Sequence, residues 1–322
     1  MKLLHTLLLG LAPLCMAATA QAQAYPTKPV RIVVSFAAGG GVDRMARVLA
    51  QQLENQMGQT FVVENRPGAS GSIGADAVAK SSPDGYTILA GGNPELTFMP
   101  AVNDKLSYDP QRDLAPLVLA VNVPSVIVAH PDKGIKSVAQ LMELARSADG
   151  IAYGTPGRGT PMHLALEMLN AQNGTRFIHL AYRGGGPATA DVVAGQIKVA
   201  VINAPRVLPH IRAGKLLALA VMQDARSPLL PDVPTFKEAT GIDGVRAPAW
   251  FGFSAPAKVP ADIRARLEKE ITRALNDPDI KGKLTASGMD VVALPAARMA
   301  DVIRDEAAYN VATIKKLGFK PD

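Results

Sequence analysis

Cysteine is almost absent from this sequence, and charged residues do not gather into blocks. The one cysteine, Cys15, lies near the N-terminus, so the rest of the chain has no disulfide and no thiol chemistry. Lysine and arginine are scattered and alternate with acidic residues, as over 262–283, so there is no basic stripe of the kind that binds nucleic acid. The formal net charge of +6 is compatible with attraction of anionic ligands.

Long apolar runs are missing after residue 24. Before it, Lys2 is followed by an apolar stretch over 3–16 and then by small residues that end at Ala24. This order predicts a secretory signal peptide over 1–24 that is cleaved before Tyr25. No later segment has about eighteen uninterrupted apolar residues, so we expect no membrane span and a periplasmic location.

The most informative pattern that is present is a glycine run at 39–41. The β-branched segment 30–34 before it predicts a buried strand, and the spacing of Met45, Leu49 and Leu53 after it predicts an amphipathic helix. Backbone N–H groups at the start of a helix, together with the helix dipole, attract anions. An isolated glycine run is as often a simple strand–helix connection, so the rest of the chain has to decide.

Strand-like and helix-like segments alternate through most of the chain. This alternation predicts an α/β fold with parallel sheets that are covered by helices on both faces. The length that remains after the signal peptide suggests two domains. Strands are predicted at 30–34, 60–64, 86–90, 114–120, 125–129, 151–153, 177–181, 199–203 and 216–222. Helices are predicted at 43–57, 72–80, 137–147, 161–171, 187–195, 206–213 and 261–275.

Seven motifs in a fixed order resemble the solute-binding proteins of tripartite tricarboxylate transporters, the Bug family. Each motif alone is weak, but together they span the chain after the signal peptide. They are VRIVVSFAAGGGVD (30–43), VENRPGASGSIGA (63–75), YGTPGRGTPMHL (153–164), YRGGGPA (182–188), LPHIRAGKL (208–216), RSPLLPDVPT (226–235) and WFGFSAP (250–256).

The resemblance implies a periplasmic binding protein of type II. Such a protein has two lobes, each with a mostly parallel sheet flanked by helices, and a ligand cleft between them. Lobe I is then expected to comprise 25–124 plus 246–322, and lobe II 125–245. The expected partners are a small organic carboxylate and the integral membrane permease subunits of the transporter, with no nucleic acid, and the chain is expected to be a monomer.

The resemblance also implies how the ligand is held. In the family, the first glycine loop and loops of the second lobe grip one carboxylate with backbone amides and ordered water, which supplies the hydrogen bonds that a desolvated anion needs. We expect the amides of 38–40 and 184–186 to do this, and the side chains of Arg158, Asn93 and Ser70 to read the far end of the ligand. The predicted ligand-binding residues are Phe36, Ala38, Gly39, Gly40, Ser70, Gly71, Asn93, Thr155, Arg158, Thr160, His163, Tyr182, Gly184, Gly185 and Asn203.

Some polar residues near these loops have a structural interpretation. Asp43 is expected to stabilise the start of a helix, because a carboxylate beside a bound carboxylate would repel it. Thr160 before Pro161 is typical of a helix N-cap. For His163, lining the cleft and a structural role both remain open, and Arg158 either pairs with a ligand or faces solvent.

Enzyme motifs are incomplete. The first glycine turn resembles a dinucleotide-binding fingerprint, with Glu64 about twenty residues further on, but Arg44 stands where that fingerprint has a third glycine. Segment 68–72 lacks the last glycine of a serine-hydrolase elbow. The histidines show no metal-ligand spacing, so we expect no metal, no cofactor and no enzyme activity. An exported ligand sensor remains an alternative, and a dinucleotide-dependent oxidoreductase a weaker one.

Overall fold

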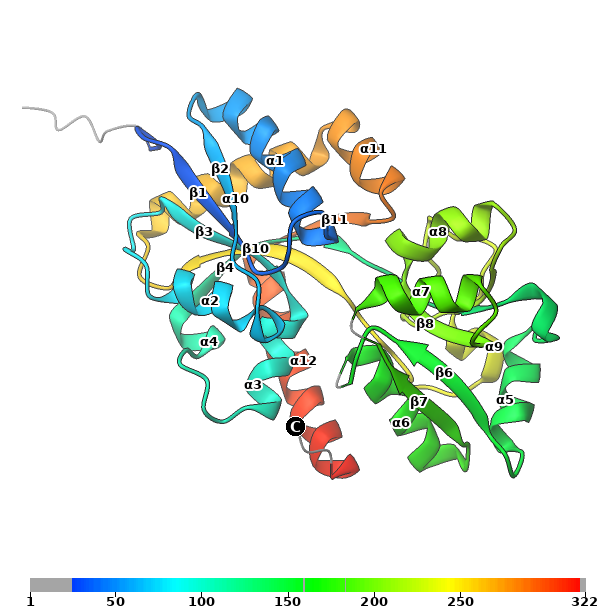
Figure 1. Cartoon of the computed structure of the whole chain (residues 1–322). Coiled ribbons are helices and arrows are strands. Elements are labelled where there is room, and N and C mark those ends of the chain that lie inside the picture. The colour runs from blue at the N-terminus through cyan, green and yellow to red at the C-terminus, as the bar shows by residue number, and fades with distance from the viewer. Residues whose placement is uncertain (1–24, 159, 183, 319–322) are drawn as a thin grey trace, which may run out of the picture.

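The computed structural model describes residues 25–158, 160–182 and 184–318 and shows two lobes, each built on one β-sheet with flanking helices (Figure 1). This confirms the predicted fold class. We call the part on the first sheet lobe I and the part on the second sheet lobe II. The predicted signal peptide, 1–24, lies outside the described residues.

Lobe I has a six-stranded sheet. Its strands are β1 (Val30–Val34), β2 (Phe61–Asn65), β3 (Thr87–Gly92), β4 (Leu114–Asn122), β10 (Trp250–Pro256) and β11 (Asp290–Pro295), in the order β11-β4-β10-β3-β1-β2. Its helices include the short 3-10 turn η1 and the π-helical segment η2. They are α1 (Gly41–Met57), η1 (Ala69–Gly71), α2 (Ser72–Ala79), η2 (Pro94–Phe98), α3 (Met99–Val102), α4 (Pro110–Asp113), α10 (Ala261–Asn276), α11 (Pro278–Ala286) and α12 (Ala296–Leu317).

Lobe II has a five-stranded sheet. Its strands are β5 (Ser125–Ala129), β6 (Ile151–Thr155), β7 (Phe177–Ala181), β8 (Val199–Asn203) and β9 (Leu217–Val221), in the order β7-β6-β8-β5-β9. Its helices are η3 (Pro131–Lys133), α5 (Val138–Arg146), α6 (Pro161–Asn173), α7 (Gly185–Val193), α8 (Ala204–Arg212) and α9 (Phe236–Thr240). Strands β6, β7 and β8 are parallel, so α6, α7 and α8 all begin at one edge of the sheet.

Both sheets are mixed rather than wholly parallel. In lobe I, β1 is parallel to β2 and β3, whereas β10 is antiparallel to β3 and β4, and β11 is antiparallel to β4. In lobe II, β5 is antiparallel to β8 and β9. The reversals follow from the path of the chain, because β4 runs toward lobe II while β10 brings the chain back.

The apolar periodicity of the first strand and helix places the lobe I core where the sequence predicts it. Val30, Ile32 and Val34 are fully buried in one cluster with Met45 and Leu49 of α1. Burial of each such side chain contributes about 1.5–3 kcal/mol of hydrophobic free energy. The core therefore fixes the end of β1 and the start of α1, which together position the glycine turn between them.

Two extended segments cross between the lobes and are hydrogen-bonded to each other. The N–H of Val123 donates to the carbonyl of Ala249 at 2.7 Å, and the hydroxyl of Ser125 donates to the carbonyl of Ala247 at 2.7 Å. Paired crossings of this kind are suited to hinge motion between lobes. Within the described ranges, no helix combines the length and the apolar character that crossing a bilayer requires.

Candidate functional site

The first glycine turn, between β1 and α1, is closed by its own hydrogen bonds. Gly39 adopts a φ of +79°, which favours glycine, and its N–H donates to Asp43 Oδ2 at 2.9 Å. The N–H of Gly40 donates to the carbonyl of Ala37 at 3.3 Å. Both amides are thus used within the turn in this structure, and their contact with the ligand stays a prediction.

The amides that stay open at this turn are those of Ala38 and of the first two residues of α1. Among the described residues, no acceptor lies within hydrogen-bond distance of the backbone N–H groups of Ala38, Gly41 and Val42. The last two lie at the positive end of a 17-residue helix, where an anion is stabilised. The open amides thus include the predicted Ala38 and extend one to two residues beyond the predicted segment 38–40.

Asp43 has a structural role in the first turn of α1, although Gly40 and not Asp43 is the N-cap residue and no side chain of the described residues caps the helix. Its buried side chain accepts hydrogen bonds from Gly39 N–H, from Arg47 Nε at 3.1 Å and from Asn65 Nδ2 at 2.9 Å. Burial would raise the pKa of this carboxyl, but these hydrogen bonds and the Arg47 charge outweigh burial and lower it. Asn65 also donates to the carbonyl of Phe36 at 3.0 Å, which holds the predicted Phe36 segment in place.

The second glycine turn, between β7 and α7, is fastened to the neighbouring loop. The N–H of Tyr182 donates to Thr155 O at 3.1 Å, and the N–H of Gly184 donates to Pro156 O at 2.8 Å. The Tyr182 hydroxyl donates to Asp191 Oδ2 at 2.7 Å, so its hydrogen atom already takes part in a hydrogen bond within lobe II. The open amides are those of Gly185 and 186, which have no acceptor in the described part of the chain.

Helices α7 and α8 of lobe II face helix α1 of lobe I. In Figure 1, α7 and α8 occupy the side of lobe II that is turned toward α1 and β11. A Cβ built on Gly288, just before β11, would lie 2.7 Å from Cα of Pro205 in α8. A Cβ built on Gly41 would lie 3.7 Å from Met289 Cε. Lobe contacts therefore run from the start of α1, through 288–289, to the start of α8.

A third loop of lobe I, between β2 and α2, has an unusual backbone. Ala69 and Ser70 adopt φ values of +46° and +52°, between Gly68 at +128° and Gly71 at +93°. Positive φ in two successive non-glycine residues costs free energy and is typical of functional loops. Ser70 is exposed and Gly71 is buried, so of the two predicted residues only the serine is open to solvent.

Buried Glu95 lies beneath this loop. A Cβ on Gly71 would approach Glu95 Oε2 to 2.7 Å, and the N–H of Gly92 donates to Oε1 at 2.8 Å. Burial raises the pKa of Glu95 to about 7, although hydrogen bonds act in the opposite direction. The sequence offers no local signal for this residue, because its neighbours come from three separate loops.

Asn93 lies at the crossing between the lobes rather than in either glycine turn. Its Nδ2 donates to the carbonyl of Pro248 at 2.9 Å and to Glu306 Oε1 at 3.1 Å. Trp250 Nε1 donates to Glu306 Oε2 at 2.7 Å, and burial raises the pKa of Glu306 to about 7. Both donors of the Asn93 amide are thus used to join lobe I to the hinge, which argues against its predicted role as a specificity residue.

Three predicted residues of lobe II form a separate group. The rings of His163 and His179 stack with their centroids 3.8 Å apart, and Thr155 Oγ1 lies 2.7 Å from His179 Nε2. Arg158 and both histidines line a cavity of about 410 Å³ together with Glu167, Ala181 and Leu317. Burial lowers the pKa of His163 to about 3 and that of His179 to about 4, and the Arg158 charge adds to both shifts.

Thr160 caps α6 as the sequence predicts, since its Oγ1 accepts a hydrogen bond from His163 N–H at 3.4 Å. Asn203 precedes α8, and its Nδ2 donates to Ser125 Oγ at 3.4 Å. One residue that the sequence analysis does not single out lies close by. Arg206, in the first turn of α8, extends over Gly185, and only the pairing of two distant segments reveals this contact.

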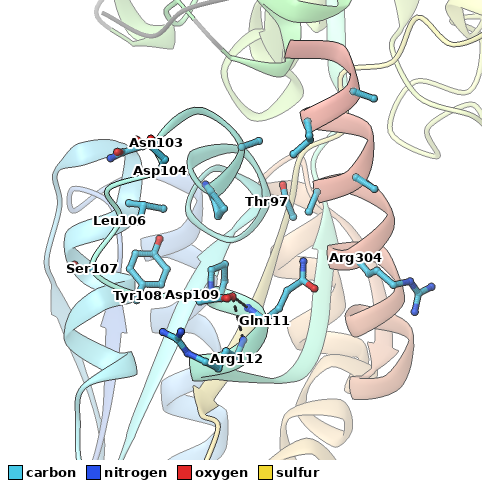
Figure 2. A pocket seen from close by; sticks show the side chains of 17 residues that line it. Thr97, Asn103, Asp104, Leu106, Ser107, Tyr108, Asp109, Gln111, Arg112 and Arg304 are labelled. Atoms are coloured by element: carbon cyan, nitrogen blue, oxygen red, sulfur yellow. Dashed lines mark hydrogen bonds between the residues drawn. The ribbon is translucent and has the colours of Figure 1, made fainter. Parts of the chain in front are cut away.

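A larger cavity of about 890 Å³ lies away from these loops, within lobe I (Figure 2). It is bounded by the segment 97–112 and by α12. Figure 2 shows the Arg304 side chain directed away from it, and Arg304 pairs with Asp301 and Asp305. No group of three or more metal-ligating side chains occurs among the described residues.

Comparison with known proteins supports one family. Residues 45–319 match the tripartite tricarboxylate transporter family receptor. The chain is 33% identical to the protein BugT of Bordetella pertussis, over 99% of this chain and 98% of BugT. It resembles the structure of Rpa4515 from R. palustris with adipate (31% identity, TM-score 0.82, 92% of this chain, 100% of that one). It also resembles the structure of MatC from Rhodopseudomonas palustris with bound malate (28% identity, TM-score 0.77, 90% of this chain, 100% of that one).

Proposed function

The chain belongs to the tripartite tricarboxylate transporter receptor family, and on that premise we propose that it binds a small organic carboxylate between its lobes and delivers it to the integral membrane subunits of a tripartite transporter. As a member of this family it is a solute-binding receptor and not an enzyme. The Rpa4515 structure contains adipate and the MatC structure contains malate, which supports an acid as the ligand of this chain as well.

One observation carries this proposal. Helix α7 lies on the side of lobe II that is turned toward α1 (Figure 1), and the starts of both helices present backbone N–H groups that have no acceptor among the described residues. A carboxylate that leaves water needs several hydrogen bonds, and backbone amides supply them without loss of side-chain entropy. An anion placed between these helix starts gains from both helix dipoles.

The proposal includes closure of the lobes around the ligand. Residues 25–124 and 246–322 move as lobe I and residues 125–245 as lobe II, about the two crossing segments. An acid that contacts both helix starts binds the closed form more tightly, and only such a difference in affinity shifts the population toward it. Export rests on the predicted signal peptide over 1–24, and solved relatives with this fold are periplasmic proteins.

A thermal-shift screen of the chain without residues 1–24 tests the proposal. We expect a subset of mono-, di- and tricarboxylates to raise the melting temperature, since a ligand at a hundredfold excess over its Kd stabilises the native state by about 2.7 kcal/mol. Small-angle scattering should show contraction with the same acids. If no carboxylate changes the melting temperature, or if mass spectrometry shows the acid chemically converted, the proposal is wrong.

Delivery is tested in cells. A strain without this chain should lose uptake of the labelled acid that the screen selects, and a plasmid copy should restore it. Uptake that continues at the original rate would contradict a role in transport and would favour the sensor alternative.

A further inference from the structure

Arg206 extends from α8 across the start of α7. A Cβ built on Gly185 would lie 2.8 Å from Arg206 Cδ and 3.1 Å from its Nε. A Cβ built on Gly186 would lie 3.8 Å from Nη1. Because Gly185 has no side chain, the aliphatic stem of the arginine packs directly on the helix start, and its guanidinium group stands beside the open amides of residues 185 and 186.

Arg206 forms no ion pair with the residues that the structure describes. No acidic side chain of the described ranges lies within ion-pair distance of it, whereas Arg47 and Arg246 pair with Asp43 and Asp224. Arg206 lies in the first turn of α8 and beside the first turn of α7. A cation is disfavoured at the positive end of a helix dipole, so two helix starts and a guanidinium together form a site that favours an anion.

This cation lies on the face of lobe II that meets lobe I. Its neighbour Pro205 touches Gly288, and the adjacent Met289 lies near Gly41 at the start of α1. Ser227 Oγ donates to Asp290 Oδ2 at 3.0 Å, a second contact between the lobes in the same region. Arg206 is therefore beside the start of α7, and its neighbour Pro205 is linked to the start of α1 through 288–289.

We propose that Arg206 determines ligand specificity by binding a second carboxylate of the ligand, while the amides at the starts of α1 and α7 hold the first. This inference rests on the proposed function, because it assumes an acid between the lobes. A guanidinium group binds a carboxylate through two parallel hydrogen bonds, and Arg206, at the start of α8, can bind a second carboxylate next to the one that the amides of α1 and α7 hold. The receptor should accordingly prefer diacids to monoacids of the same length.

The test compares each diacid with its own half ester. Succinate, malate and adipate are titrated calorimetrically against wild type and against Arg206→Gln, alongside their monomethyl esters, which keep the length and lose one charge. We expect the substitution to weaken the tightest diacid about tenfold or more and its half ester by less than about twofold, since one charge-assisted hydrogen-bonded pair is lost. Arg206→Lys keeps the charge but lacks the planar guanidinium group, so its affinity for the diacid should lie between those of wild type and Arg206→Gln.

Arg212→Gln is the matched control, because Arg212 is an exposed arginine in the last turn of the same helix. It should leave every affinity unchanged, and the melting temperature of each variant shows that it is folded. Equal weakening of diacid and half ester by Arg206→Gln, or no weakening of either, overturns the inference while the proposed function stands. A wild-type chain that binds none of the acids, and shows no thermal shift with the wider panel, overturns both.

Discussion

The buried carboxyl group of Glu95 accepts a 2.6 Å hydrogen bond from the hydroxyl of Ser35, at the point where β1 leads into the first glycine turn. The same group accepts from Gly92 N–H, and its Oε2 lies against Gly71 without a hydrogen-bond partner in the described part of the chain. One side chain thus joins three loops of lobe I, and its protonation state affects all of them.

We expect Glu95→Gln to change how stability depends on pH. Burial raises the pKa of Glu95 from 4.5 to about 7, so the native chain keeps a proton that the unfolded chain releases between those values. The free energy of unfolding should therefore fall as pH rises through this window, by roughly 3 kcal/mol for this group. The difference between wild type and variant, measured by urea denaturation at pH 5, 6, 7 and 8, should show that slope. The exposed Glu143→Gln control should show none, and parallel curves for wild type and Glu95→Gln would contradict the prediction.

The stacked histidines should act in the opposite direction. The pKa of His179 is lowered to about 4, chiefly by burial, so between about pH 4 and 6.5 the unfolded chain binds a proton that the native chain does not. The free energy of unfolding should rise with pH across this window and be lost as the solution becomes acidic. In His179→Gln, the free energy of unfolding should fall less on acidification than it does in wild type. His130→Gln, at a half-buried histidine before η3, serves as the comparison, and an unchanged acid midpoint in His179→Gln counts against a neutral native ring.

Removal of the hinge carboxyl should destabilise the protein. Glu306→Ala leaves Trp250 Nε1 and Asn93 Nδ2 without this buried acceptor, and each unpaired buried donor costs about 1–3 kcal/mol. We expect a total loss of roughly 2–4 kcal/mol in urea denaturation. Glu306→Gln keeps an acceptor oxygen, so its free energy of unfolding should fall less than that of Glu306→Ala. Equal stability of Glu306→Ala and wild type would show that these bonds add nothing.

A side chain at the start of α1 should weaken every acid alike. A Cβ at Gly41 would lie 2.8 Å from the Phe251 ring, so Gly41→Ala displaces either the ring or the helix start that carries the open amides. Calorimetry should show affinity reduced about tenfold, or 1.4 kcal/mol, for diacid and half ester together. Gly282→Ala, at a helical glycine with open space around it, should bind normally. Normal affinity in Gly41→Ala would place the anion elsewhere.

The sequence predicts those parts of the fold that have strong local patterns. Strands such as 30–34 and 125–129 are found with the predicted bounds because each is a short segment rich in β-branched apolar residues. In contrast, apolar periodicity does not predict α12, since the buried residues of this helix are sparse and include polar Asn310 and Thr313. It also misses β11, a half-buried strand at the edge of its sheet that is interrupted at Ala293 by a positive φ.

In the candidate site as well, features with local sequence patterns are predicted and features that depend on distant contacts are not. Glycine turns and the Thr160 cap are visible in the sequence, because each depends on neighbours a few residues away. Glu306 contacts Asn93 across 213 positions, and Arg206 reaches Gly185 only because α7 and α8 begin at one sheet edge. Contacts that depend on such pairings cannot be derived from local spacing, which is why the sequence predicts neither the Asn93–Glu306 hydrogen bond nor the contact of Arg206 with Gly185.

Trp250 gives the hinge an optical reporter of its own. It is the single tryptophan of the chain, and it begins β10 where the second crossing segment enters lobe I. Intrinsic indole fluorescence therefore originates at the hinge alone, without any attached dye. The indole N–H is bonded to Glu306, a carboxyl whose charge changes near neutral pH, so the emission wavelength should follow both lobe movement and the ionisation of that group.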